Sequence, residues 1–76
     1  MSNLDTQVGG GHYKDLAIQP IEYTVKNKLS FLQGNVIKYI TRYKDKNGVE
    51  DLKKVKHYVD FILEFEYGVT QDNDWY

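Results

Sequence analysis

The chain of 76 residues contains no cysteine, and this absence excludes disulfide bonds and metal sites built on thiolates. Its two histidines are too few for a histidine cluster, so we expect no metal site. No apolar run approaches the roughly 20 residues of a membrane span, and the N-terminus lacks the hydrophobic segment of a signal peptide. The sequence therefore predicts a cytoplasmic protein without a membrane partner.

A chain this short has little capacity for a core of its own. A domain of this size buries only about 60% of the surface that its unfolded chain exposes, so its stability alone is marginal. The chain also contains seven tyrosines, three phenylalanines and one tryptophan, and aromatic residues are enriched at protein interfaces. Both features predict a homo-oligomer.

The net charge of −1 argues against binding of long nucleic acids, but the charges are segregated along the chain. Seven of the ten cations lie between Lys38 and Lys56, whereas the acids concentrate after them. A basic centre in a nearly neutral protein favours a small anionic or phosphorylated ligand over a long polyanion.

Local signals predict helices and no strands, because no segment of useful length alternates with period two. Pro20 suits the first turn of a short helix that ends at Asn27 or Lys28. Its expected apolar face comprises Ile21, Thr24 and Val25. We expect a flexible arm at residues 1–11, a single helical domain at 12–68 and an acidic, aromatic tail at 69–76.

Two longer helices follow in the predicted domain. Ser30 and Gln33 have the spacing of a capping box at the start of the central helix. That helix is expected to end around residues 45–48, where Asn47 or Gly48 provides a left-handed cap. Acids then open the last helix, and Gly68 ends it. The predicted fold is all-α, with a short first helix and a long αα-hairpin.

The central helix shows two faces. An apolar stripe comprises Leu32, Val36, Tyr39, Ile40 and Tyr43. Beside it run Asn35, Lys38 and Arg42, which either line an anion site or form an ordinary solvated flank. Gly34 costs about 1 kcal/mol relative to Ala in a helix, so we expect another helix or a ligand close to it.

The antiparallel hairpin is expected to bring this row next to Asp51, Lys54 and Tyr58. There Arg42 could hold phosphate with two parallel hydrogen bonds, and Tyr39 or Tyr58 could stack on a base. Asp51 either orients a cation for the ligand or forms a simple salt bridge across the hairpin. Three glycines precede residues 12–14, and this segment either approaches a ligand closely or frays as a tail.

Four segments together resemble a bacteriophage domain family, the SaV-like family. They are residues 12–14 (H-Y-K), 19–22 (Q-P-I-E), 34–42 (G-N-V-I-K-Y-I-T-R) and 48–55 (G-V-E-D-L-K-K-V). A related domain forms part of the nucleotide kinase of a podovirus, so the resemblance implies a phage protein that handles nucleotides. On the matched positions it implies ligand contacts for His12, Lys14, Asn35, Lys38, Arg42, Asp51 and Lys54. Tyr13, Tyr39 and Tyr58 complete the expected nucleotide-binding set.

Three functions remain open at this point. The first is binding of a small phosphorylated nucleotide without turnover and without a cofactor, in the cytosol of an infected bacterium, where it could sequester a host immune signal. The second is a nucleotide kinase acting on deoxynucleoside monophosphates without a P-loop, which would use magnesium. The third is a regulator that binds a host protein. We expect no dedicated catalytic residue for the first function, which is the preferred one.

Overall fold

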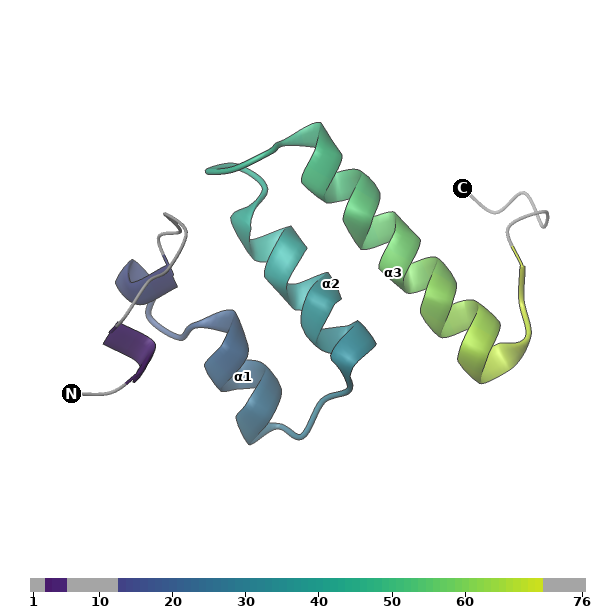
Figure 1. The fold of residues 1–76 in the computed structure, drawn as a ribbon, viewed down its shortest axis with the longest axis horizontal. Coiled ribbons are helices and arrows are strands. Elements are labelled where there is room, and N and C mark those ends of the chain that lie inside the picture. Colours follow the sequence, from purple (N-terminus) through teal and green to yellow (C-terminus); the bar gives the residue numbers. More distant parts are fainter. Residues whose placement is uncertain (1–2, 6–12, 71–76) are drawn as a thin grey trace.

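The computed structural model describes residues 3–5 and 13–70 and confirms the all-α class. Three α-helices make up the fold, α1 (Pro20–Lys26), α2 (Phe31–Arg42) and α3 (Val49–Tyr67). Two short 3₁₀ turns precede them, η1 (Asn3–Asp5) and η2 (Tyr13–Asp15). The short first helix and the long αα-hairpin of α2 and α3 are those expected from the sequence (Figure 1).

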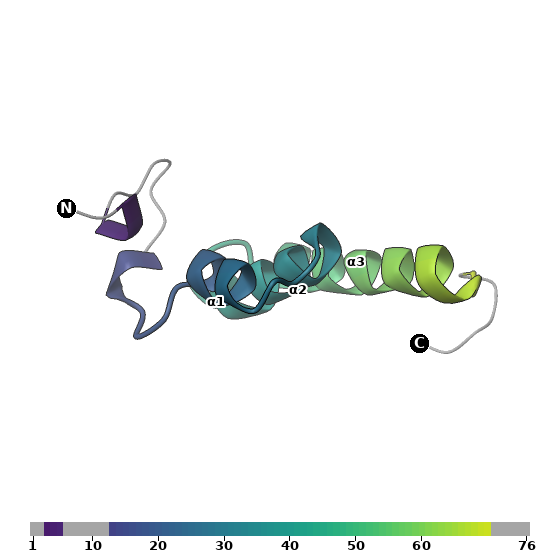
Figure 2. The ribbon, with the colours of Figure 1, turned by 90° about the horizontal axis from the view of Figure 1, so that it is seen from below.

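The three helices lie side by side in a single layer. Helix α2 is the middle one, because it packs on α1 along one side and on α3 along the other (Figure 1). Viewed from the edge, the layer is one helix thick (Figure 2). The molecule measures 46 × 27 × 18 Å, and its radius of gyration of 14.1 Å exceeds the about 11 Å of a compact chain of this length.

A single layer leaves both of its broad faces open to solvent. Among the described residues only Pro20, Asp51 and Asp60 are buried, so apart from the proline ring no aliphatic or aromatic side chain is buried. The hydrophobic side chains between the helices are at best half-buried. The large hydrophobic residues that remain exposed are Leu16, Ile18, Ile21, Tyr23, Val25, Phe31, Ile40, Val49, Phe65 and Tyr67.

Helix α1 contacts α2 through a smaller surface than its sequence suggests. Ile21 and Val25, expected on its packing face, are 62% and 68% exposed. Thr24, the third residue of the expected face, does contact α2, since a Cβ on Gly34 would lie only 2.8 Å from the Thr24 Cγ2 atom. The costly glycine of the central helix therefore makes room for a neighbouring helix.

The connection from α1 to α2 uses a backbone conformation that the sequence does not signal. The Leu29 N–H donates to the Thr24 carbonyl oxygen, and the Lys28 N–H donates to that of Val25. These two bonds form a Schellman motif, in which the residue that follows the C-cap adopts a left-handed backbone conformation. Here that residue is Lys28, with φ of 56°, where glycine is the usual choice.

The capping box at the start of α2 is confirmed. The Gln33 N–H donates to the Ser30 hydroxyl oxygen at 3.1 Å, and the Ser30 N–H donates to the Gln33 side-chain oxygen at 2.9 Å. These bonds satisfy donors that the first turn of a helix leaves without partners. The apolar stripe of the helix is buried only in part, because Ile40 remains 45% exposed.

Helix α2 ends at Arg42, earlier than expected. The Asp45 N–H donates to the Arg42 carbonyl oxygen and the Gly48 N–H to that of Tyr43, so residues 43–48 form tight turns. Gly48 has a positive φ of 53° but is the N-cap of α3, so the expectation that it caps α2 is wrong. Gly68 ends α3 as predicted, and its backbone is left-handed with φ of 70°.

The segments that flank the helices are described in part. Within the predicted arm, the Gln19 side-chain amide donates to the Leu4 carbonyl oxygen of η1. The rest of the arm, His12 and residues 71–76 lie outside the described residues. Of the helices in the described ranges, none combines the length and apolar character needed to cross a membrane.

Candidate functional site

A buried ion pair joins the end of α2 to the start of α3. The Arg42 guanidinium donates from Nε to Asp51 Oδ2 and from Nη2 to Asp51 Oδ1, each at 3.0 Å. The Asp51 side chain is 0% exposed and that of Arg42 is 18% exposed. Asp51 also accepts a hydrogen bond of 3.3 Å from the Asn47 N–H. One carboxylate thus fixes both helices and the turn between them.

Each partner stabilises the charged form of the other. The hydrogen bonds from Arg42 lower the pKa of Asp51 although burial acts in the opposite direction, and the Asn47 N–H adds to the lowering. The same bonds raise the pKa of Arg42. The expected salt bridge across the hairpin is therefore present, and it is bidentate. It uses two of the five N–H donors of a guanidinium, so the remaining donors can bind a ligand.

Three cations gather around the ring of Tyr39. The Lys38 Nζ, Arg42 Cζ and Lys54 Nζ atoms lie 5.3, 4.7 and 5.1 Å from its centroid. Cations within about 6 Å of an aromatic centroid are attracted by the electrons of the ring. Tyr39 also stacks on Tyr58 of α3, with centroids 5.8 Å apart and planes inclined by 16°. We call Lys38, Arg42 and Lys54, with the Tyr39 ring, the basic cluster.

The basic cluster carries more positive than negative charge. Asp51 is the carboxylate paired within it, bonded to Arg42 and 4.0 Å from the Lys54 Nζ atom. Three cations therefore share one carboxylate, and the repulsion among them is reduced when an anion binds between them. Lys38 and Arg42 of the predicted row thus lie within one positively charged cluster.

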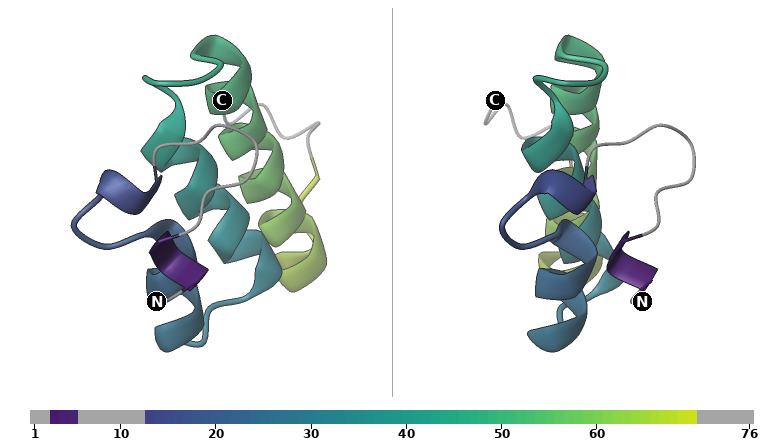
Figure 3. Two further views of the ribbon diagram at one scale, coloured as in Figure 1. Left: turned by 60° about the vertical axis from the view of Figure 1, so that its left-hand side comes forward. Right: turned by 90° about the vertical axis from the view of Figure 1, so that its left-hand side faces the viewer.

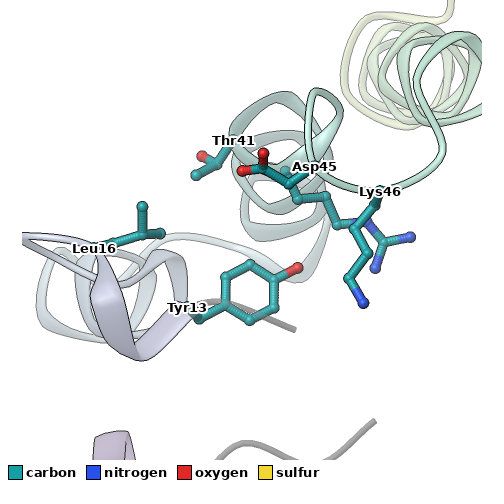
Figure 4. A pocket seen from close by; sticks show the side chains of 6 residues that line it. Tyr13, Leu16, Thr41, Asp45 and Lys46 are labelled. Atoms are coloured by element: carbon teal, nitrogen blue, oxygen red, sulfur yellow. The ribbon is translucent and has the colours of Figure 1, made fainter. Parts of the chain in front are cut away.

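A shallow recess adjoins the basic cluster on the side of η2. Its lining comes from Tyr13, Leu16, Thr41, Arg42, Asp45 and Lys46, and it is partly open to solvent (Figure 4). The Tyr13 ring crosses the recess toward Lys46 (Figure 4). Its hydroxyl is buried and interacts with Arg42, which raises the pKa of that guanidinium further. Arg42 borders both the recess and the Tyr39 ring, so the two regions form one continuous site.

The structure brings together most of the residues expected from the sequence. Six of them form the Arg42–Asp51 pair, the basic cluster and its stacking partner, namely Lys38, Tyr39, Arg42, Asp51, Lys54 and Tyr58. Tyr13 reaches the same site through the recess.

The other expected residues take less part in the site. The Asn35 side-chain amide donates to the Phe31 carbonyl oxygen at 2.9 Å, which occupies one of its two amide N–H groups within the helix. Lys14 is an exposed residue of η2, and the position of His12 is not described. Sequence reasoning missed Leu16 and Thr41, whose residue types carry no functional signal and which only the fold brings to Arg42.

The fold and the geometry define a small all-α hairpin protein with a cluster of cations around an aromatic ring. The described residues contain no group of three or more histidines or acidic residues suited to a metal ion. The chain belongs to the family DUF3310, a protein family of unknown function whose model matches residues 8–60. Comparison with the curated proteins and with the solved structures gave no match.

Proposed function

We propose that this protein binds a small phosphorylated nucleotide, with its phosphate at the basic cluster and without turning it over. The observation that carries this proposal is the convergence of three cations on one side of a bidentate ion pair. Asp51 holds Arg42 in a fixed position, and the Tyr39 ring positions Lys38 and Lys54 beside it. A site organised before the ligand arrives loses less conformational entropy on binding.

Phosphate suits these donors better than a neutral ligand does. Arg42 offers N–H groups beyond those bonded to Asp51, and Lys38 and Lys54 each supply an ammonium group. Each hydrogen bond to a charged group contributes about 1.5–3 kcal/mol. The buried Tyr13 hydroxyl, which interacts with Arg42, lies at the edge of this set of donors.

The recess beside the cluster is shallow and partly open to solvent. It does not enclose a ligand as deep ligand pockets do, so a nucleotide would lie over the surface of the hairpin with its phosphate at the cations. The base can stack on the ring of Tyr39, which is only half-buried within the cluster. Aromatic rings stack on any base, so the structure favours no particular base.

The resemblance to the SaV-like phage domains supports the same proposal. It falls on residues of α2 and α3 that meet in the basic cluster, and a related domain belongs to a nucleotide kinase. We extend the proposal to a bacteriophage origin and to action in the cytosol of the infected host, with a host signalling nucleotide as one possible ligand.

Incubation with a mixture of nucleotides tests binding and turnover together. The purified chain is mixed with nucleoside mono-, di- and triphosphates and cyclic dinucleotides in the presence of magnesium, separated from free ligand, denatured and analysed by mass spectrometry. We expect one class of nucleotide to be recovered intact. Recovery of a phosphorylated product would establish the kinase alternative, and recovery of no nucleotide would overturn the proposal.

A further inference from the structure

A continuous row of aromatic rings extends along the hairpin away from the basic cluster. Phe31 meets Tyr58 edge to face with centroids 6.4 Å apart, and Tyr58 lies 6.1 Å from Phe61. Phe61 stacks on Phe65 at 5.7 Å with planes inclined by 14°. We call these four rings the aromatic face. Its outer members are open to solvent, since Phe31 is 76% and Phe65 68% exposed.

The chain exposes more surface than a compact protein of its mass. Its accessible surface is 5853 Å², whereas a compact monomer of 8.9 kDa exposes about 4,800 Å². The excess of about 1,000 Å² is comparable to the about 800 Å² that each partner buries in a stable interface. Because no described aliphatic or aromatic side chain other than Pro20 is buried, a protein partner on the aromatic face would supply the missing core.

The charges along α3 indicate which partner fits. Its first half carries Lys53, Lys54 and Lys56 against Glu50 and Asp51, whereas its second half carries three acids and no lysine or arginine. Beside the aromatic face, Lys53 and Glu64 lie on the same flank of the helix. A second α3 in antiparallel orientation places Lys53 of each copy on the same side of the contact as Glu64 of the other. A parallel arrangement would bring like charges together, which costs free energy.

We infer that the aromatic face is covered by a second copy of this chain, with α3 antiparallel to α3 about a two-fold axis. Such an axis makes the contact self-complementary, because each copy offers the same patch. With the axis next to Phe61, His57 of one copy lies opposite Glu64 of the other. In this arrangement the parts of the two α3 helices that contact each other lie after Asp51 in the chain. This inference therefore does not depend on nucleotide binding.

Replacement of Phe65 tests the contact, and Val49 provides a matched control. Both residues lie on α3 and are similarly exposed, at 68% and 67%, but about 160° separates them around the helix. By analytical ultracentrifugation the native chain should have twice the mass of 8.9 kDa. Phe65→Glu should raise the dissociation constant by at least about 30-fold, and Val49→Glu should leave it unchanged. A monomeric native chain, or equal effects of both variants, would overturn the inference.

Cysteine cross-linking tests the orientation even if the dimer is required for folding. Because the native sequence has no cysteine, the double variant His57→Cys/Glu64→Cys reports only on these two positions. They are about 10 Å apart along one helix, too far for a disulfide within a chain. We expect the double variant to form a disulfide-linked dimer under oxidation, while each single variant stays unlinked. Cross-linking of a single variant to itself, or none in the double variant, would contradict the antiparallel arrangement.

Discussion

The change in stability caused by replacing Gly34 with alanine depends on Thr24, and the structure predicts the size of this change. In a helix interior this replacement alone stabilises by about 0.8–1 kcal/mol. Here the new Cβ would lie 2.8 Å from the Thr24 Cγ2 atom, well inside the about 3.5–4.0 Å of a favourable carbon contact. Overpacking of this kind costs about 1–3 kcal/mol. Gly34→Ala should therefore destabilise the native chain by up to about 2 kcal/mol.

The sign should reverse when Thr24 is shortened. In a Thr24→Ala background the atom nearest to the new methyl group is the Cβ of residue 24, at 3.7 Å, which is an ordinary contact. Gly34→Ala should then stabilise by about 1 kcal/mol, so the coupling between the two sites is about 1–3 kcal/mol.

Thermal unfolding of the native chain, the two single variants and the double variant measures this coupling. A change of 1 kcal/mol shifts Tm by about 4–8 °C in a domain of this size. All four must be compared at one protein concentration, because association raises the apparent stability. Equal stabilisation by Gly34→Ala in both backgrounds would refute the close packing of α1 on α2.

Three further changes test the structure elsewhere. Asp51 has a lowered pKa in the folded chain, so its contribution to stability is full above the ordinary carboxyl pKa of about 3.9 and is lost as pH falls through the folded-state pKa. Asp51→Asn should lower the urea midpoint at pH 7 and flatten its decline in acid, and an unchanged acid profile would contradict the ion pair. Ser30→Ala should cost about 0.5–2 kcal/mol through loss of the cap, seen as a lower Tm, and an unchanged Tm would argue against the capping box. Lys28→Gly should raise Tm, because a left-handed backbone costs a non-glycine residue about 1–2 kcal/mol, whereas a lower Tm would contradict the positive φ at this position.

Local sequence signals predicted the helices well, because they act between residues close in the chain. The capping box of Ser30 and Gln33, the proline at the start of α1 and the glycine after α3 each mark a helix end through its own backbone hydrogen bonds. The spacing of Lys38, Arg42, Asp51 and Lys54 was informative for a related reason, since an antiparallel hairpin leaves few ways for two helices to meet.

Features that depend on contacts between helices were not predictable in the same way. The apolar residues of α1 suggested a packing face, but Thr24 makes the contact with Gly34 and Val25 stays exposed. The early end of α2 follows from Asp51, which binds Arg42 and the Asn47 N–H and so favours a compact turn. Leu16 joins the recess only because η2 lies beside α2, and nothing local in the sequence encodes that position.

Lysine variants separate a specific phosphate site from general positive charge. Lys54 belongs to the basic cluster, 5.1 Å from the centroid of Tyr39, whereas the adjacent Lys53 is exposed on another side of α3. The two replacements remove the same charge from neighbouring positions, so Lys53→Ala is the matched control for Lys54→Ala.

Isothermal titration with deoxynucleoside monophosphates, and with the matching nucleosides, tests the proposed site most directly. We expect the native chain to bind a monophosphate but not its nucleoside. Lys54→Ala should weaken binding by about 10- to 100-fold, the effect of one charge-assisted hydrogen bond, and Lys53→Ala should leave it unchanged. Equal affinity for nucleoside and nucleotide, equal losses in the two variants, or no binding of any phosphate would contradict a nucleotide site at the basic cluster.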